Sequence, residues 1–265
     1  MRYRTCLRAA LGVALLALPF AGCATLGGAN YVSLEQEWQM GQQIEAQLAS
    51  ELDLVNDRTL TNYVNRIGQQ LVRQTTLGNR PWRFYVVNDD RVNAFNVPGG
   101  LVYVHTGLIA RAGSAAELVG AMAHEVAHGA LRHGTRRMSQ AYEANVIAGA
   151  VLGRNPGIAQ QVAAQVVATG AFARFSRADE NEADRIGVPI MAQAGYDPEG
   201  LARMLERLLE DNQRDPGAVG RFFSTHPTTR ERVANVRALA RSVNRSGLRM
   251  NDGDFAAARS RAQRY

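Results

Sequence analysis

The spacing of apolar residues changes twice along this chain, and it predicts helices on both sides of a short region of strands. Residues 33–50 and 57–72 carry apolar side chains every three or four positions, which is the period of an amphipathic helix. Ser33 forms a capping box with Gln36, three positions later, and Asp57 is a typical N-cap. We therefore expect one helix to begin after each of these two caps.

Three short segments with aromatic and β-branched residues follow the second helix. They span residues 82–87, 93–97 and 101–104, and Pro98-Gly99-Gly100 separates the last two. This composition, bounded by turn residues, is typical of strands. Strands that lie so close together in the sequence predict a small three-stranded sheet with mainly antiparallel pairing.

The rest of the chain returns to helical spacing. A helix begins at Ser114, where Glu117 completes another capping box, and we expect it to reach His133. Further helices are predicted over residues 136–152, 158–172, 176–195, 197 onwards and 228–243. Residues 245–265 are polar and rich in arginine, so we expect a polar C-terminal tail there. The predicted fold class is α+β, mostly helical, with the sheet beside the Ser114 helix and one domain over residues 33–244.

The N-terminus has the composition of an export signal. Three arginines among the first eight residues precede an apolar run over residues 9–20, and small residues then lead to Cys23. This order predicts a secretory signal peptide over residues 1–22. An uncleaved membrane anchor is the alternative, but the run is shorter than the roughly 20 residues that a membrane-spanning helix needs.

Cys23, directly after Ala21-Gly22, resembles the lipobox of bacterial lipoproteins, although Phe20 stands where that pattern has leucine. In those proteins the cysteine is acylated and becomes the mature N-terminus. The resemblance implies a lipid anchor at Cys23, with residues 23–32 as a lipidated tether. Ala24, in place of aspartate, implies sorting to the outer membrane, so that the protein faces the periplasm.

Charge and cysteine content narrow the function classes further. All 30 basic residues are arginine, against 24 acidic residues, and removal of residues 1–22 leaves 27 arginines and a formal charge of +3. Because no basic stretch is interleaved with aromatic residues, we expect no nucleic acid partner. Cys6 and Cys23 are the two cysteines of the chain, and their position excludes a disulfide-stapled fold and a zinc ribbon.

The candidate chemistry lies in His124-Glu125-Val126-Ala127-His128, in the middle of the Ser114 helix. Residues four positions apart share a helix face, so both imidazoles can reach one Zn²⁺ while Glu125 faces a water bound there. This pattern is typical of zinc peptidases with Glu125 as the general base. Two surface histidines on an ordinary helix are the alternative.

A catalytic zinc site needs a third protein ligand. Glu180 and Asp184 lie four positions apart in an acidic stretch at the start of a predicted helix. Glu180 can bind the metal, and Asp184 can accept the N–H of a zinc-bound histidine and fix its tautomer. A solvated acidic helix start, stabilised by the helix dipole, is the alternative, and composition alone leaves both open.

His124-Glu125-x-x-His128, followed by Phe175-Ser176-Arg177-x-x-Glu180-x-x-Ala183-Asp184, resembles the HtpX/BepA/LoiP-like family of zinc metallopeptidases, which are gluzincins. The resemblance covers about residues 60–240. It implies a helical zincin domain of the minigluzincin type without transmembrane helices, one Zn²⁺ per chain, and Glu180 as the third ligand. Glu182, on a different helix face, is the rival ligand.

Two other segments resemble the same family. Asn93-Ala94-Phe95-Asn96, before Pro98-Gly99-Gly100, resembles a segment that lies as an edge strand beside the substrate, which implies that these four residues bind an extended peptide. Ser224-Thr225-His226-Pro227, with Arg232, resembles the C-terminal His-Pro element of the family.

The roles of His226 and Arg232 stay open at this point. His226 is expected to lie near the metal, where it stabilises the oxyanion or closes the open zinc position and keeps the enzyme latent; a structural histidine before Pro227 is the alternative. Arg232 is expected to stabilise the oxyanion or bind a substrate carboxylate, with a plain ion pair as the alternative. His133 is interpreted as a helix-end cation, and His105 as structural.

Together these features predict a zinc-dependent endopeptidase that hydrolyses unfolded or misassembled proteins of the cell envelope. The expected partners are extended protein substrates, the membrane through the lipid anchor, and the machinery of outer-membrane assembly. A zinc-containing lipoprotein chaperone with latent or no proteolysis is the alternative function.

Overall fold

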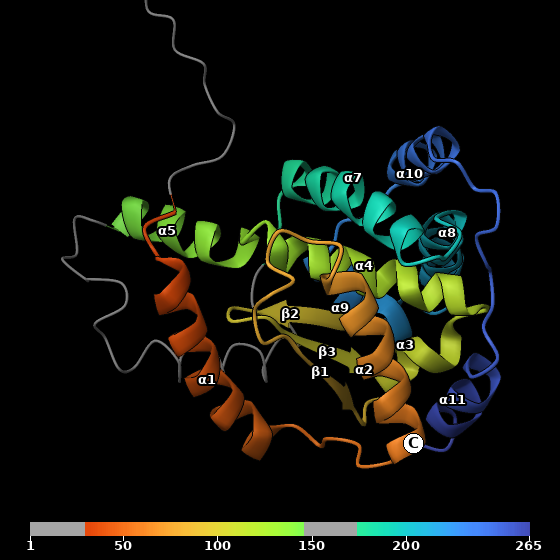
Figure 1. Ribbon diagram of the computed structural model, residues 1–265, viewed down its shortest axis with the longest axis horizontal. Coiled ribbons are helices and arrows are strands. Elements are labelled where there is room, and N and C mark those ends of the chain that lie inside the picture. The colour runs from red at the N-terminus through yellow and green to blue at the C-terminus, as the bar shows by residue number, and fades with distance from the viewer. Residues whose placement is uncertain (1–29, 146–173) are drawn as a thin grey trace, which may run out of the picture.

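A computed structural model describes residues 30–145 and 174–265 of the chain (Figure 1). The expected signal peptide, Cys23 and the helix expected over residues 158–172 lie outside the described residues, and the helix expected over 136–152 lies partly outside them. Asn30 and Tyr31, in the described end of the expected tether, contact the helix α5 (His133–Asn145): Asn30 Nδ2 donates to Thr135 Oγ1 at 2.9 Å, and the Tyr31 N–H donates to Ser139 Oγ at 2.9 Å.

The described residues form helices around one small sheet. In chain order the elements are α1 (Leu34–Glu51), α2 (Arg58–Val72), β1 (Arg83–Val87), β2 (Ala94–Val97), β3 (Leu101–His105), α3 (Thr106–Arg111), α4 (Ala115–Ala130), α5 (His133–Asn145), α7 (Arg177–Gln193), α8 (Glu199–Arg214), α9 (Pro216–Thr225), α10 (Arg230–Ser242) and α11 (Phe255–Ala262). The expected caps Ser33, Asp57, Ser114 and Ser176 each accept the backbone N–H three positions later. The α+β fold class is confirmed.

The sheet is mixed, and the expectation of mainly antiparallel pairing is wrong. The strand order is β1-β3-β2. The turn at residues 98–100 makes β2 and β3 an antiparallel hairpin, whereas β1 lies on the other side of β3 and runs parallel to it. The chain therefore passes from β1 across to the far edge of the sheet before it returns to the centre, a crossing that local sequence patterns do not encode.

Alternate residues of the strands enter two separate hydrophobic clusters, because successive side chains of a strand point to opposite faces. One face, including Ala94, Val102 and Val104, joins the main core with α2 and α4. The other face, including Phe95 and Tyr103, packs against α1. Both faces of the sheet are thus covered, and β2 lies at the edge that is next to α4.

Helix α4 is the centre of the fold and lies between the sheet and the pair α7 and α8 (Figure 1). Residues 115–129 are all buried, as expected for a helix that is covered on every side. Small residues allow this packing: a Cβ added to Gly200 of α8 would lie 2.3 Å from the backbone oxygen of Ala116. The helix that carries the His-Glu-x-x-His motif is therefore held in place by its neighbours along its length.

Helix α4 ends at Ala130, so the expectation that it continues to His133 is wrong. Arg132 adopts a left-handed conformation with φ of 57°, which breaks the helix, and α5 begins at His133. This conformation is unfavourable for a residue other than glycine. The Arg132 guanidinium donates to the buried Glu37 of α1 at 2.6 Å and to the carbonyl of Val32, and these contacts hold the turn.

The C-terminal residues are folded, so the expectation of a polar tail over 245–265 is wrong. Phe255, Ala258 and Ala262 of α11 belong to the main hydrophobic core, and α11 packs against α2 and α3. The domain therefore extends beyond the expected boundary at residue 244. The sequence indicates this helix by apolar residues at helical spacing among the arginines.

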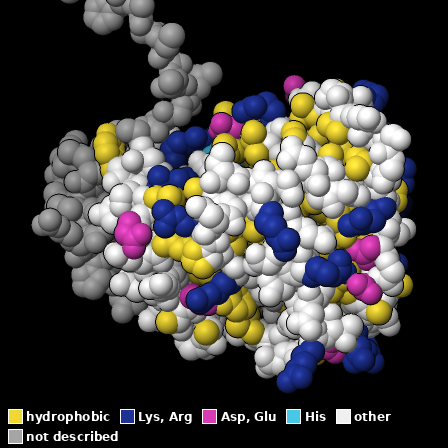
Figure 2. Space-filling view, in the orientation of Figure 1, with side chains coloured by type: hydrophobic (Ala, Val, Ile, Leu, Met, Phe, Trp, Pro, Cys, Tyr) yellow, Lys and Arg dark blue, Asp and Glu magenta, His cyan; other side chains and the backbone are white. Residues whose placement is uncertain are grey.

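The described surface is mixed in character. In the view of Figure 2, arginine side chains are spread over the face among apolar and uncharged residues, and histidine is almost hidden. Among the described residues, no helix is both long and apolar enough to span a membrane.

Candidate metal centre

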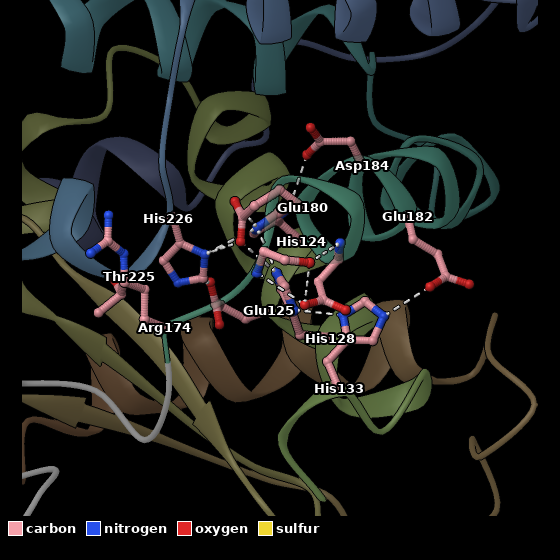
Figure 3. A network of polar contacts seen from close by, with 12 residues as sticks. His124, Glu125, His128, His133, Arg174, Glu180, Glu182, Asp184, Thr225 and His226 are labelled. Atoms are coloured by element: carbon pink, nitrogen blue, oxygen red, sulfur yellow. Dashed lines mark hydrogen bonds and ion pairs between the residues drawn. The ribbon is translucent and has the colours of Figure 1, made fainter. Parts of the chain in front are cut away.

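All five histidines of the chain are buried, and three of them converge with one carboxylate at the centre of the fold. His124 and His128 come from α4, Glu180 from α7, and His226 from the segment after α9 (Figure 3). One ligand atom from each of these four residues lies within 4.8 Å of the other three. The structure thus brings together residues that are up to 102 positions apart in the chain.

The spacing of these atoms fits a tetrahedral metal ion. Nε2 of His124 lies 3.0 Å from Nε2 of His128 and 3.3 Å from Nδ1 of His226, and the Glu180 carboxylate lies 3.1–3.4 Å from all three rings. Zinc–nitrogen distances of about 2.0–2.1 Å in a tetrahedral site place ligand atoms about 3.3–3.4 Å from one another. The donor set, imidazole nitrogens with a carboxylate oxygen, is one that zinc accepts.

The charges of the cluster also suit a metal. Burial alone would raise the pKa of the Glu180 carboxyl, but His226, His124 and Arg232 hold that pKa well below its usual range. Burial, with the neighbouring His124, lowers the pKa of His128 well below its usual range. A carboxylate and a neutral imidazole are the protonation states that metal ligands require.

Asp184 and Arg232 lie behind His124. Oδ1 of Asp184 lies 2.9 Å from Nδ1 of His124, as the sequence predicts for a carboxylate that fixes the tautomer of a ligand. Burial and Arg232 would lower the pKa of His124, but Glu180 and Asp184 raise it to about 9. The two carboxylates therefore stabilise a positive charge near the His124 ring, which either a proton or a metal cation can provide.

The guanidinium of Arg232 forms ion pairs with two acidic residues, Asp184 and Glu180. It donates to both oxygens of Asp184, at 2.7 and 2.9 Å, and also contacts Glu180. Its side chain is 4% exposed. This geometry corresponds to the ion-pair alternative of the sequence prediction, and Arg232 supports two residues of the site from behind.

Glu125 lies beside the cluster and not in it. Its Oε1 is 3.3 Å from Nε2 of His226, and the backbone N–H of Asn96 in β2 donates to the same carboxylate. Its Oε2 is buried without a hydrogen-bond partner among the described residues. Burial raises the pKa of Glu125, so this carboxyl is poised to take and return a proton near the four ligand atoms.

His226 lies among the candidate ligands and is 1% exposed. Its two ring nitrogens face different groups: Nδ1 faces Glu180 and His124, and Nε2 faces Glu125. His226 therefore lies beside the other candidate ligands, and its predicted role near a metal remains a prediction. His105, at the end of β3, lies 3.6 Å from Asp89 and packs edge-on against Phe95, outside the cluster.

Glu182, the rival third ligand, does not join the cluster. At 3.6 residues per turn it points about 160° away from Glu180, whereas Asp184 points only about 40° away. The Glu182 carboxylate instead lies 3.2 Å from Nε2 of His133. The helix face thus separates the two candidates, as the sequence predicts.

The four residues expected to bind substrate are buried in the present arrangement. Ala94 and Phe95 belong to the two hydrophobic clusters, and Phe95 stacks on Tyr103 with ring centroids 5.0 Å apart. Asn93 is fully buried and Asn96 is 6% exposed. Asn96 is the member of this segment with a contact to Glu125, while a groove of about 330 Å³ opens beside Glu180 between α7 and α10.

Sequence reasoning missed two neighbours of His128. Phe175 stacks on the His128 ring, with ring centroids 4.0 Å apart and planes at 27°. His133 places its Nδ1 2.8 Å from Nδ1 of His128, so it is not the helix-end cation that we expected. The sequence holds one indication for Phe175: it directly precedes the N-cap Ser176, which places it at the start of α7.

Comparison with known proteins agrees with this geometry. Residues 58–240 match the model of peptidase family M48. The chain is 31% identical to the beta-barrel assembly-enhancing protease of Escherichia coli (strain K12) over 239 residues, which are 87% of this chain and 49% of that protein. It is 29% identical to the mitochondrial metalloendopeptidase OMA1 of Schizosaccharomyces pombe over 213 residues, which are 78% of this chain and 62% of that protein.

The chain thus spans about half the length of the bacterial relatives it matches; the beta-barrel assembly-enhancing protease of Yersinia pestis, 31% identical, is covered over 46% of its length. The match to the family model includes both histidines of α4, the acidic face of α7 and Arg232. With most of its length matched by the family model, the chain belongs to peptidase family M48.

Proposed function

We propose that this protein is a zinc-dependent endopeptidase that acts on unfolded or misassembled proteins of the bacterial cell envelope. One observation carries the proposal: candidate ligand atoms of His124, His128 and Glu180 lie 3.0–3.4 Å from one another, with the Glu125 carboxylate beside the cluster. Membership of a peptidase family supports hydrolysis of peptide bonds as the reaction.

In this proposal His124, His128 and Glu180 hold one Zn²⁺. Zinc in a site of this kind lowers the pKa of water to about 7 and polarises the scissile carbonyl. The Glu125 carboxylate would take a proton from the attacking water and pass it to the leaving amine as the peptide bond breaks. Its burial and the N–H of Asn96 hold that carboxylate in place for both transfers.

Asp184 and Arg232 would act on the ligands and not on the substrate. Asp184 accepts the Nδ1–H of His124, which leaves Nε2 free for the metal. Arg232 holds Asp184 with two hydrogen bonds and offsets the charge of Glu180. Because its guanidinium contacts Asp184, Glu180 and the His124 ring, we assign it a positioning role in place of oxyanion stabilisation.

An extended peptide is the proposed substrate, bound along β2. This strand lies at the edge of the sheet and its Asn96 contacts the proposed general base. Backbone pairing with an edge strand selects extended segments and tolerates many sequences. Since Asn93 to Asn96 are buried in this arrangement, the proposal requires neighbouring residues to move before a peptide can pair there.

Digestion of casein tests the proposed activity. The full chain should cleave casein with Zn²⁺ present, stop when a chelator is added, and resume when Zn²⁺ is restored. Folded substrates should be cleaved more slowly than casein, because they offer few extended segments. Cleavage that continues at full rate in excess chelator would contradict a zinc mechanism.

The location in the cell envelope is a separate part of the proposal. It rests on the N-terminal pattern that ends at Cys23 and on the similarity to an assembly-enhancing protease. The protein would be a lipoprotein on the periplasmic side of the outer membrane, in quality control near the outer-membrane assembly machinery. Radiolabelled palmitate should enter the wild type and not Cys23→Ser; equal labelling of both would refute the anchor.

A latent protease that serves as a chaperone is the second candidate. It is favoured by the position of His226, whose Nδ1 can occupy the fourth tetrahedral position and leave no place for water. In that case His226→Ala should cleave casein at least as fast as the wild type. A collapse of kcat in His226→Ala would instead assign His226 to stabilisation of the oxyanion.

A further inference from the structure

The second ring nitrogen of His128 has an unusual partner. Metal-binding histidines commonly donate this N–H to a carboxylate or a carbonyl. In this protein Nδ1 of His128 lies 2.8 Å from Nδ1 of another imidazole, that of His133, which is fully buried (Figure 3). The contact is shorter than the distances of 3.0–3.4 Å given above among the four candidate ligands.

His133 is in turn bound to an acid on α7. Its Nε2 lies 3.2 Å from Oε2 of Glu182, which is 35% exposed. Arg136, one turn further along α5, donates to the same Oε2 at 3.2 Å and to Asp179 at 2.8 Å. The carboxylate that meets His133 is thus itself held by a cation.

The protons of this chain of contacts can be assigned in one consistent way. If Nε2 of His128 binds a metal, the neutral ring carries its proton on Nδ1 and donates it to Nδ1 of His133. His133 then carries its own proton on Nε2 and donates it to Glu182. His133 thus accepts one hydrogen bond from His128 and donates one to Glu182, so neither imidazole needs a positive charge.

The two histidines of the His-Glu-x-x-His motif are therefore supported by parallel arms. His124 donates directly to Asp184, which Arg232 holds. His128 reaches Glu182 through an intervening imidazole, and Arg136 holds that acid. Three acids at alternate positions of α7 thus face three different groups: Glu180 the cluster, Glu182 the His133 arm, and Asp184 the His124 arm.

The turn at Arg132 makes the His133 arm possible. In a continuous helix a residue five positions after His128 would point about 140° away from it. The left-handed Arg132 ends α4, and α5 restarts in a direction that returns His133 to His128. Contacts of Arg132 with Glu37 and Val32 hold this turn.

We propose that His133 and Glu182 form a positioning relay that orients His128 for metal binding, which rests on the proposed zinc site. The relay fixes the tautomer and the ring plane of His128, while Phe175 stacked on the same ring restricts its rotation. Glu182, although not a ligand, is then a determinant of zinc affinity at the exposed end of the relay.

Zinc affinity of purified variants tests the relay. His133→Phe keeps a ring of similar size but removes the acceptor, whereas His133→Asn keeps an acceptor near the position of Nδ1. Glu182→Ala removes the far end at a partly exposed position, where folding is least at risk. His105→Gln is the matched control, because His105 is an equally buried histidine that lies outside the cluster.

Three measurements are made on the full chain of each variant: the zinc Kd by competition with a chromophoric chelator, the visible spectrum of the Co²⁺-loaded protein, and the Tm of the metal-free protein. We expect His133→Phe to weaken zinc binding about 10–100-fold and to shift the Co²⁺ bands. His133→Asn and Glu182→Ala should weaken it less. His105→Gln should leave the Kd and the spectrum unchanged, whatever its Tm.

The relay is refuted if His133→Phe and Glu182→Ala bind zinc within about twofold of the wild type, with unchanged Co²⁺ spectra. It is also refuted if zinc affinity follows the metal-free Tm across all variants, His105→Gln included. If the wild type binds one zinc and cleaves casein, and His133→Phe binds zinc as the wild type does, the relay is refuted and the proposed function stands. A wild type that binds no zinc would remove the proposed function together with it.

Discussion

Replacing Arg232 with methionine should cost far more stability than the same change at Arg237. Both arginines belong to α10, and each contacts two acidic residues. They differ in burial: the Arg232 side chain is 4% exposed, and that of Arg237 is 32% exposed. The pair of variants therefore compares one interaction in two environments on a single helix.

The expected magnitudes follow from what each change leaves behind. When the Arg232 guanidinium is removed, Asp184 loses hydrogen bonds of 2.7 and 2.9 Å and Glu180 loses its ion pair. Two buried carboxylates then remain near each other. Removing one partner of a buried ion pair costs about 3–5 kcal/mol. Arg237 is partly exposed where it pairs with Glu199 and Glu206. Its replacement should therefore lower the free energy of unfolding by less than about 1 kcal/mol.

Unfolding of both variants by heat and by urea, in the presence of a chelator, measures this difference. At about 2–4 °C per kcal/mol for a domain of this size, Arg232→Met should lower the Tm by about 6–20 °C. Added Zn²⁺ should reduce the loss of Tm in Arg232→Met, because a bound cation also offsets the charge of Glu180. Equal and small losses for the two variants would refute the assignment of Arg232 as a buried support of the site.

Two further predictions concern the choice between Glu180 and Glu182 as the third ligand and the role of Phe95. Glu180→Gln should lose bound zinc while Glu182→Gln keeps it, because the glutamine at position 182 can still accept from His133; zinc lost only in Glu182→Gln would contradict the ligand set. Phe95→Ala should lower the free energy of unfolding by about 3–5 kcal/mol, because the ring is buried on Tyr103. The KM of the remaining activity should stay unchanged, whereas a raised KM with little loss of stability would make Phe95 a substrate contact.

The geometry of the candidate metal cluster is predictable from the sequence where helical periodicity determines it. The four-residue spacing places His124 and His128 on one face of α4, and the same spacing places Asp184 close to Glu180 on α7. The rings of His124 and His128 meet as this rule requires, and Arg232 contacts both Glu180 and Asp184. Tertiary packing brings α7 and His226 to this point of α4. The resemblance to a family predicts this meeting, whereas helical periodicity does not.

Features that break local periodicity were missed. His133 was assigned to the end of a continuous helix because nothing in the sequence near Arg132 indicates a left-handed turn. The contacts that hold this turn come from Glu37 and Val32, about 100 residues earlier in the chain. The parallel pairing of β1 with β3 was missed for a similar reason, since strand order depends on the path between the strands.

The central claim is that one zinc ion and Glu125 together carry out peptide hydrolysis. Metal content and casein cleavage, measured on the same preparations of the wild type and Glu125→Gln, test it most directly. Both proteins should bind one zinc per chain, and the variant should cleave about 10²–10⁴-fold more slowly, the usual contribution of a general base. A Glu125→Gln protein that holds its zinc and cleaves casein at the wild-type rate would contradict the account.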